Sequence, residues 1–512
     1  MSVPLEEGLI RAWAYALALV VFCLPIYSPD LFWHLSAGRW ILAHLAVPSS
    51  DSFTFTALGA PWIDFEWGTQ AAWFGAHALG GLRALWVLKM LVLAAAFWPV
   101  DGLLRDAKAS GAARAGALAL WLGAMLAQSD LRADLMSAVF FAVILRRLAR
   151  GRASFLFGFG LFALWANLHA GFVMGFLLYA LAAATGAEGI SAEATGAVLG
   201  SLMNPYGAAI YKVLGAHASG SVAKMIFEWG PPSLRVPFQA PLVIALLLTA
   251  GVAWVERRRA SRFLLLTALG TGAAAALSAR FGTYFAAGGT ALVFTAYARP
   301  RVSAVFFGLA LMTGLLILPV KTTGLGAAFF DGYVARRGCD FVATEKPLRA
   351  LRLFNQYEWG GYLGWRLNGG LVFGDGRYLF LSQLGETQEA LQSPAALAEF
   401  ARRRALDGFL IKNYPGTTAS LRAYPDGTTK EFARPWHVSF FPRERWALAY
   451  WDDQALLFVD RAKVPADWLA AHEYRWLRPG DGAALADARA RGEVPEAALA
   501  AEARRHQAET GR

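Results

Sequence analysis

The sequence predicts an α-helical polytopic membrane protein with about eleven transmembrane helices, followed by a C-terminal soluble α/β domain. Composition is the first reason: the 512 residues are 56% hydrophobic and only 17% charged, with a mean hydropathy of +0.39. One or two soluble cores would not bury that much apolar surface. The second reason is that apolar runs close to the roughly 20 residues needed to cross a bilayer recur through the first part of the chain.

The apolar runs that we expect to span the membrane are spread over residues 12 to 320. They lie near 12–28, 83–100, 114–128, 135–149, 154–168, 171–187, 190–203, 240–255, 263–279, 282–298 and 303–320. The first run follows Glu6, Glu7 and Arg11, and no small-residue cleavage pattern comes after it. We therefore expect a retained first helix rather than a removable signal.

Basic clusters between the runs predict the orientation of the chain. They lie at Arg105, Lys108 and Arg114, at Arg146, Arg147, Arg150 and Arg152, at Arg257, Arg258, Arg259 and Arg262, and at Arg299 and Arg301. Cytoplasmic loops carry such an excess of basic residues. The net charge of +11 therefore indicates topology rather than a nucleic-acid partner. With a cytoplasmic N-terminus, an odd number of spans places everything after about residue 321 outside.

The predicted outer loops hold most of the unusual polar residues. They are Asp30, His34, Asp51, Asp64, Glu66, Asp130, Arg132, Asp134, His169, Asn204, Glu228 and Arg280. Ionisable groups near the membrane are costly unless they are paired or lie in a wet cavity, so their gathering on one side predicts a site. For Asp64, Asp130 and Glu228 the alternative of an ordinary solvated loop stays open.

The first outer loop contains the leading catalytic candidate. Pro29 and Asp30 suit a helix start, and in such a helix Asp30 and His34 are four residues apart and share a face. A carboxylate at a membrane surface can act as the general base towards a hydroxyl nucleophile. The alternative is that Asp30 only caps the helix while His34 packs at the interface. Glu66 is the second acid of this loop.

Several motifs resemble the C-superfamily (GT-C) of glycosyltransferases that use lipid-linked sugars, such as protein O-mannosyltransferases and aminoarabinose transferases. More narrowly, they resemble a bacterial group of membrane proteins in that superfamily. The matching segments are Asp-x-x-Trp-His-Leu-x-x-Gly-Arg at 30–39, Pro48 to Thr56, Trp62 to Trp67, Trp165-x-Asn167-x-His169, Pro205-Tyr206-Gly207, Glu358-Trp-Gly-Gly-Tyr-Leu363 and Val372-Phe-Gly-Asp-Gly-Arg377. Two positions depart from the group: Phe65 stands where a histidine is usual, and Ala133 follows Arg132 where a proline is usual.

The resemblance implies an inverting transfer of a sugar from a polyprenyl-phosphate carrier to a glycan, lipid or protein acceptor. The reaction would take place on the outer face of the bacterial inner membrane, with the C-terminal domain periplasmic. Asp30 would activate the acceptor hydroxyl or assist the departure of the carrier phosphate, and Glu66, the second acid of the loop, is the other catalytic candidate. The substrate-binding residues would be His34, Arg39, Arg132, Asp134, His169 and Arg280, with the arginines binding phosphate. For Arg132 and Arg280, snorkelling to the membrane interface is the alternative.

No metal or other cofactor is expected to be required. Some members of the superfamily use a divalent cation, but the acids here are scattered and show no tight ligand spacing. The two cysteines, Cys23 and Cys339, fall in different environments, so we expect no disulfide between them. The implied partners are the lipid-linked donor, membrane lipids and the acceptor.

From about residue 321 the composition changes to that of a soluble α/β domain, predicted over 321–482, with a helical or partly disordered tail at 483–512. Strand-like runs lie at 370–373, 408–412, 446–451 and 455–459, and the last two flank a hairpin turn at 452–454. Asn355, Glu358, Asp375 and Arg377 lie beside glycines and aromatic residues, a composition that suits either sugar binding or structural turns.

Three other functions compete with the transferase. A transporter or flippase would show inverted repeats and a midplane polar path, and we detect no repeat. An envelope scaffold would need only one or two spans. A glycan ligase or polymerase acting on a lipid carrier would use residues of the same kind as the transferase.

Overall fold

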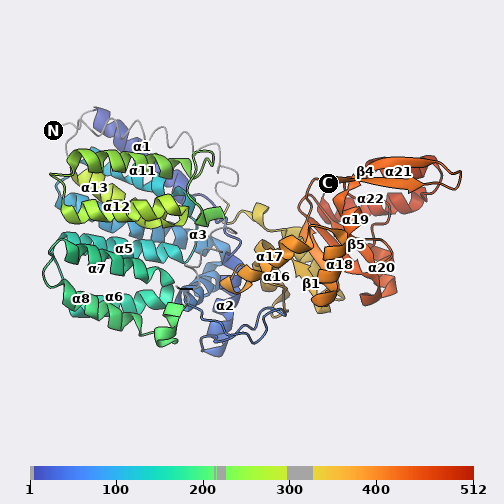
Figure 1. Cartoon of the computed structure of the whole chain (residues 1–512), viewed down its shortest axis with the longest axis horizontal. Helices are drawn as coiled ribbons and strands as arrows, with labels where there is room; N and C mark the ends of the chain where they lie inside the picture. The colour runs from blue at the N-terminus through green and yellow to red at the C-terminus, as the bar shows by residue number, and fades with distance from the viewer. Residues whose placement is uncertain (1–4, 213–214, 216–226, 297–326, 512) are drawn as a thin grey trace. The chain divides into compact units, whose positions relative to one another are not determined.

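The computed structural model describes residues 5–212, 215, 227–296 and 327–511. The chain divides into two compact units, which are described separately below (Figure 1). Unit 1 consists of Met1–Ser28, Ala37–Ser49 and Ile63–Phe330, and unit 2 of Pro29–Ser36, Ser50–Trp62 and Asp331–Arg512. Two segments of the predicted first outer loop therefore belong to the same unit as the C-terminal region.

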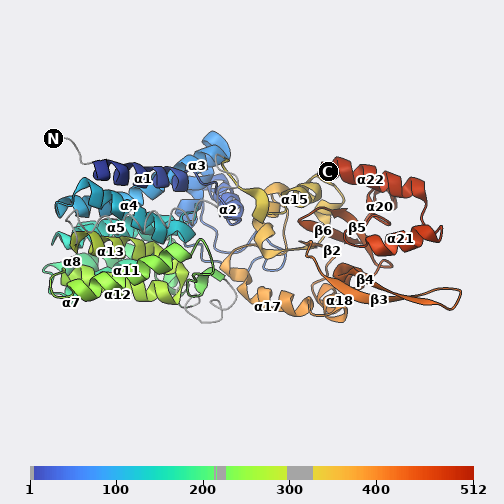
Figure 2. The same cartoon turned by 90° about the horizontal axis from the view of Figure 1, so that it is seen from above.

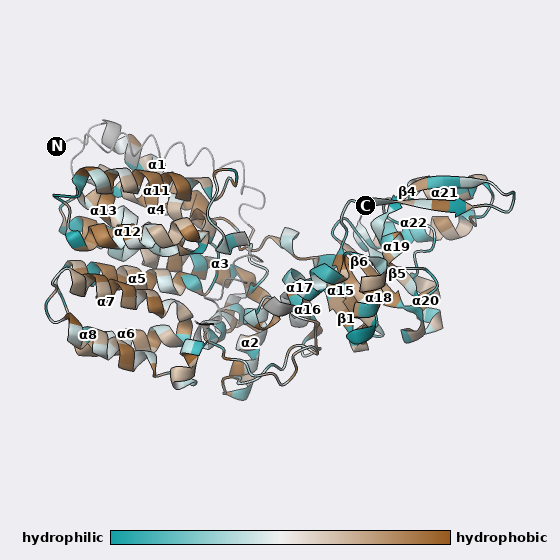
Figure 3. Ribbon diagram, in the orientation of Figure 1, coloured by the Kyte–Doolittle hydropathy of each residue, from teal (hydrophilic) through white to brown (hydrophobic). Residues whose placement is uncertain are grey.

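Unit 1 is built from helices. They are α1 (Leu5–Phe22), the C-terminal part of α2 (Leu31–His44), α3 (Trp67–Asp106), α4 (Gly111–Met125), α5 (Asp134–Ala149), α6 (Phe155–Leu168), α7 (Val173–Ala184), α8 (Ile190–Ser201), α11 (Ala240–Glu256), α12 (Arg262–Leu277) and α13 (Gly282–Ala296). Figure 2 shows these helices from a second side, and Figure 3 shows hydrophobic residues along most of them.

The predicted fold class with about eleven transmembrane helices is wrong. Within the described residues, α3 is the one helix that is both long and apolar enough to cross a membrane. The other strongly apolar helical stretches have 10–17 residues. At 1.5 Å per residue they measure at most about 26 Å, short of a hydrocarbon core of about 30 Å. The predicted span at 303–320 lies outside the described residues.

Much of the apolar surface that suggested further spans is buried between helices. One cluster joins α1, α4, α11 and α13 through residues such as Leu17, Trp121 and Leu242, and a second joins α5, α6 and α7. Glycines bring α6 and α8 into backbone contact. A Cβ atom added to Gly196 or Gly200 would lie 2.2 Å from a carbonyl oxygen of α6, so only glycine fits there.

Unit 2 contains a four-stranded sheet in the order β1-β2-β6-β5. The central strands β2 (Gly408–Lys412) and β6 (Ala455–Asp460) run antiparallel, with Lys412 opposite Ala455. Strand β1 (Leu353–Asn355) pairs in parallel with β2, and β5 (Trp446–Trp451) pairs antiparallel with β6. A separate hairpin is formed by β3 (Thr417–Ala423) and β4 (Thr429–Pro435).

Helices complete unit 2. They are α15 (Arg336–Thr344), α16 (Gly360–Leu367), α17 (Leu381–Ala390), α18 (Pro394–Arg403), α19 (Trp436–Phe440), α20 (Ala466–His472), α21 (Gly482–Ala490) and α22 (Glu496–Thr510). The core around β2, β5 and β6 is aromatic, with the rings of Phe441 and Phe458 stacked at 4.1 Å.

Three of the four predicted strands, β2, β5 and β6, are confirmed, together with the turn between β5 and β6. The predicted strand at 370–373 is wrong, because this segment makes only an isolated bridge between Val372 and Thr54.

Candidate functional site

Six of the eight predicted site residues belong to unit 1, and five of these lie at helix ends. Glu66 precedes α3, and His169 separates α6 from the 3₁₀ turn η2 (Ala170–Phe172). Arg132 and Asp134 lie at the start of α5, and Arg280 lies in the turn η5 (Ala279–Phe281). The sixth, Arg39 of α2, is half-buried, and this burial lowers the pKa of its guanidinium.

Glu66 and His169 form a carboxylate–imidazole pair. Oε1 of Glu66 lies 3.7 Å from Nε2 of His169, and each residue is only 8% exposed. On the other side of the ring, Nδ1 lies 2.7 Å from the Ser137 hydroxyl and accepts a hydrogen bond from the Gly171 amide at 3.0 Å.

These contacts determine the tautomer of His169. The backbone amide of Gly171 can only donate, so Nδ1 is an acceptor. The indole of Trp165 donates to the Ser137 oxygen at 2.8 Å and holds that hydroxyl beside Nδ1. A neutral His169 therefore carries its proton on Nε2, facing the Glu66 carboxylate.

The Trp165-x-Asn167-x-His169 motif holds the segment that carries Glu66. The indole nitrogen of Trp67 donates to Oδ1 of Asn167 at 2.8 Å, and the Thr69 hydroxyl donates to the Leu168 carbonyl at 2.7 Å. Two segments about 100 residues apart are thereby joined next to the Glu66–His169 pair.

Asp64 and Tyr206 also fix the segment that carries Glu66. Asp64 is 2% exposed and accepts hydrogen bonds from Gln70 at 2.7 Å and from the Glu66 amide at 3.3 Å. The Tyr206 hydroxyl accepts from the Asp64 amide at 3.0 Å and donates to the Pro48 carbonyl at 2.6 Å. The alternative of a solvated loop is therefore wrong for Asp64, which is a buried structural acid.

Arg132 and Arg280 share one carboxylate, that of Glu228. Nη1 of Arg132 pairs with Oε2 and Nη1 of Arg280 with Oε1, the latter at 3.0 Å. Burial alone would raise the pKa of Glu228, but the two guanidiniums lower it to about 2. The Arg280 guanidinium also lies over the Trp229 ring at 5.0 Å. Because one carboxylate neutralises only one of the two cations, the trio keeps a net charge of about +1.

Asp134 adds a second carboxylate to this region. It is 5% exposed, and neither of its oxygens has a hydrogen-bond partner among the described residues. Burial raises the pKa of Asp134, while the charges of Arg280 and Arg132 act in the opposite direction. Asp134 lies three residues before Ser137 on α5, one helical turn from the hydroxyl that contacts His169. The arginine pair and the Glu66–His169 pair are thus linked through one turn of helix.

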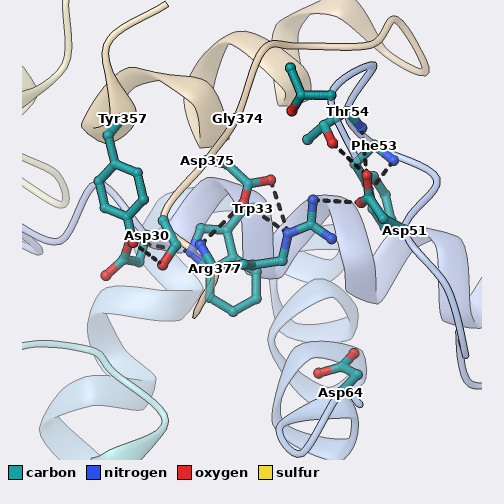
Figure 4. A network of polar contacts seen from close by, with 12 residues as sticks. Asp30, Trp33, Asp51, Phe53, Thr54, Asp64, Tyr357, Gly374, Asp375 and Arg377 are labelled. Carbon is teal, nitrogen blue, oxygen red and sulfur yellow. Dashed lines mark hydrogen bonds and ion pairs between the residues drawn. The ribbon is translucent and has the colours of Figure 1, made fainter. Parts of the chain in front are cut away.

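The two remaining predicted residues, Asp30 and His34, belong to unit 2 (Figure 4). Oδ1 of Asp30 accepts a hydrogen bond from the Trp33 indole at 3.2 Å, and the ring of His34 stacks on Trp33 at 3.6 Å. Asp30 also lies against the backbone of Gly376, where an added Cβ would come within 2.0 Å of Oδ1. The Asp30 motif and the Gly374-Asp-Gly-Arg377 motif therefore meet.

Arg377 forms a buried ion-pair network with two aspartates. Its Nη2 lies 2.7 Å from Oδ1 of Asp51, and its Nε lies 2.8 Å from Oδ1 of Asp375. All three side chains are at least 95% buried, and the Trp62 ring faces the guanidinium at 4.6 Å. Figure 4 shows this network joining the segment 50–62 to the loop that ends at Arg377. The burial of Arg377 and its ion pairs with both aspartates indicate a structural role.

Sequence reasoning missed Ser137 and Gly171, which complete the surroundings of His169. A buried serine inside an apolar helix carries no recognisable signal of its own. Among the described residues, no group of three or more His, Cys, Asp or Glu side chains is arranged to hold a metal ion. In the comparisons with known proteins, no protein-family model matches the chain and no curated protein matches it.

Proposed function

We propose that this chain is an inverting glycosyltransferase that moves a sugar from a polyprenyl-phosphate carrier to an acceptor hydroxyl. The observation that carries the proposal is the Glu66–His169 pair, joined through Ser137 and one turn of α5 to the arginines that share Glu228. One part of this cluster suits proton removal and the other suits an anionic leaving group.

In the proposed reaction, the acceptor oxygen attacks the anomeric carbon of the donor sugar and its proton passes to the Glu66 carboxylate. The bond between the anomeric carbon and the phosphate oxygen breaks, and polyprenyl phosphate leaves with the electron pair. The Nε2–H group of His169 orients the carboxylate. The positive charges of Arg132 and Arg280 stabilise the departing phosphate.

The family resemblance assigns the base role to Asp30 instead, and this is the competing assignment within the same function. Asp30 accepts a hydrogen bond from the neutral Trp33 indole at 3.2 Å, and a carboxylate is the kind of proton acceptor that the base role requires. The apolar helix α3 supports a location at a membrane, where a polyprenyl donor resides.

The decisive experiment is turnover of polyprenyl-phosphate-linked sugar by the full-length protein in liposomes. Glu66→Gln and Asp30→Asn are compared with the native chain at equal folded yield, and Glu188→Gln, at an exposed position before α8, is the matched control. A loss of at least 100-fold in Glu66→Gln with an active Asp30→Asn assigns the base to Glu66, and the reverse pattern assigns it to Asp30. Donor movement across the liposome without any consumption would refute the transferase and favour a flippase.

A further inference from the structure

A pocket in unit 2 contains none of the residues used in the proposed reaction, although its wall residue Pro29 directly precedes Asp30. Its volume is about 360 Å³, within the range of small-molecule sites. Its wall is formed by Pro29, Gly332, Tyr333, Val334, Ala335, Glu358, Trp359, Lys412, Asn413, Tyr414 and Gln454. We infer that this pocket binds a neutral saccharide.

The framework of the pocket is rigid because it is formed by the ends of the central strands. Lys412 is the last residue of β2, and Gln454 immediately precedes β6. The Asn413 side chain donates to the backbone carbonyl of Asp452 at 2.7 Å. The backbone amide of Gln454 donates to the Asp452 carboxylate at 2.8 Å. The turn at Asp452 thus orients both amide residues of the wall.

Two tyrosines of the wall are exposed residues, and the Lys412 ammonium lies 5.9 Å from the ring centre of one of them, Tyr414. Tyr333 is 56% and Tyr414 is 52% exposed, whereas most large aromatic residues of unit 2 are buried. Exposing an apolar ring has a free-energy cost that binding can recover, and the C–H face of a pyranose is a suitable partner for such a ring. Saccharide recognition combines this stacking with hydrogen bonds to hydroxyl groups.

The polar groups of the wall carry no net charge. The ammonium of Lys412 lies 3.0 Å from the Glu358 carboxylate, and the two side chains are 31% and 42% exposed. Burial lowers the pKa of Lys412, but the Glu358 charge more than offsets this and the net shift is upward, so the ammonium keeps its charge at neutral pH. One donor and one acceptor, with the two amides, suit sugar hydroxyls better than an anion or a cation.

The test is saturation-transfer NMR on the full-length protein with maltose and with N,N′-diacetylchitobiose, two neutral disaccharides. We expect the native chain to bind at least one of them at millimolar concentration. Tyr414→Ala and Lys412→Met should each weaken binding at least fivefold. Tyr414→Phe should retain it, because the ring remains.

Tyr15→Ala is the matched control, because Tyr15 is an equally exposed tyrosine (58%) in unit 1. Absence of binding of either sugar, equal binding by native chain and both pocket variants, or binding of inorganic phosphate alone would each overturn the inference. Because the assay measures binding at equilibrium, its result is independent of whether the protein turns over a lipid-linked donor.

Discussion

The hydroxyl of Ser137 lies 2.7 Å from Nδ1 of His169 and is itself held by the Trp165 indole. Together with the Gly171 amide, which donates to the same nitrogen, this contact surrounds Nδ1, and the proton of a neutral His169 is on Nε2, towards Glu66. A ring that is free to change tautomer would orient the carboxylate less well. Removing the Ser137 hydroxyl therefore tests whether Ser137 positions the His169 ring for catalysis or only fills space beside it.

In Ser137→Ala we expect kcat for sugar transfer to fall about tenfold, with the KM for the donor changed less than twofold. The pH profile should shift as well, because Nδ1 loses its contact with the Ser137 hydroxyl. The measurement is a pH series of initial rates in liposomes. Ser191→Ala, at an exposed position in α8, is the control, and an equal effect in both variants would argue against positioning.

Gly171→Ala should disrupt the surroundings of His169 by steric overlap. An added Cβ would lie 2.3 Å from the Ser137 hydroxyl, 2.4 Å from the Tyr284 hydroxyl and 2.8 Å from Nδ1 of His169. Overpacking of this kind costs about 1–3 kcal/mol. We expect a lower Tm and loss of transfer activity. Gly160→Ala is the control, because its Cβ meets nothing within 4 Å, and its stability should be unchanged or higher.

Arg377→Met should destabilise unit 2 strongly. The substitution leaves the carboxylates of Asp51 and Asp375 buried without their shared cation, a change that costs about 3–5 kcal/mol. Chemical denaturation of the native and variant proteins measures the difference. Arg402→Met is the control: it removes an arginine whose side chain is 73% exposed, and it should leave stability close to that of the native chain. Equal stability of Arg377→Met and the native chain would refute the structural role.

Arg478→Met should stabilise the protein. Arg478 is only 4% exposed. The three nitrogens of its guanidinium have no hydrogen-bond partner among the described residues. Burial lowers its pKa to about 9. Replacing an incompletely paired buried charge with an apolar chain of similar length gains about 1–3 kcal/mol. A lower Tm for the variant would contradict this expectation and would indicate a partner for the guanidinium in solution.

His437 should make stability fall in mild acid. Burial lowers its pKa from 6.5 to about 4, so between these values the unfolded chain binds more protons than the folded one. Stability therefore decreases as pH falls from about 6.5 to 4, by up to roughly 3 kcal/mol. Tm measured across this window in the native chain and in His437→Gln tests the expectation. If the two slopes are identical, His437 is not responsible.

The two units differ in how far their elements could be predicted. Strands β2, β5 and β6 follow from short apolar runs bounded by turn residues, which is local information. The hairpin of β3 and β4 was missed because its alternate residues are largely exposed and polar. In unit 1, the hydropathy pattern located most of the helices. It did not predict what their apolar faces contact, because an apolar face that meets lipid and one that meets another helix have the same hydropathy.

What the sequence by itself determined is local. It located the helices and central strands, and it placed Glu66, His169, Arg132 and Arg280 at or next to the ends of helices. What only the tertiary structure decided is which of these side chains meet. Glu66 pairs with His169 across 103 positions of sequence, and Arg377 reaches Asp51 across 326. The physical reason is that such contacts depend on how helix ends and loops pack. The local periodicity of the sequence does not contain information about that packing. It therefore does not predict contact partners such as Ser137 and Gly171.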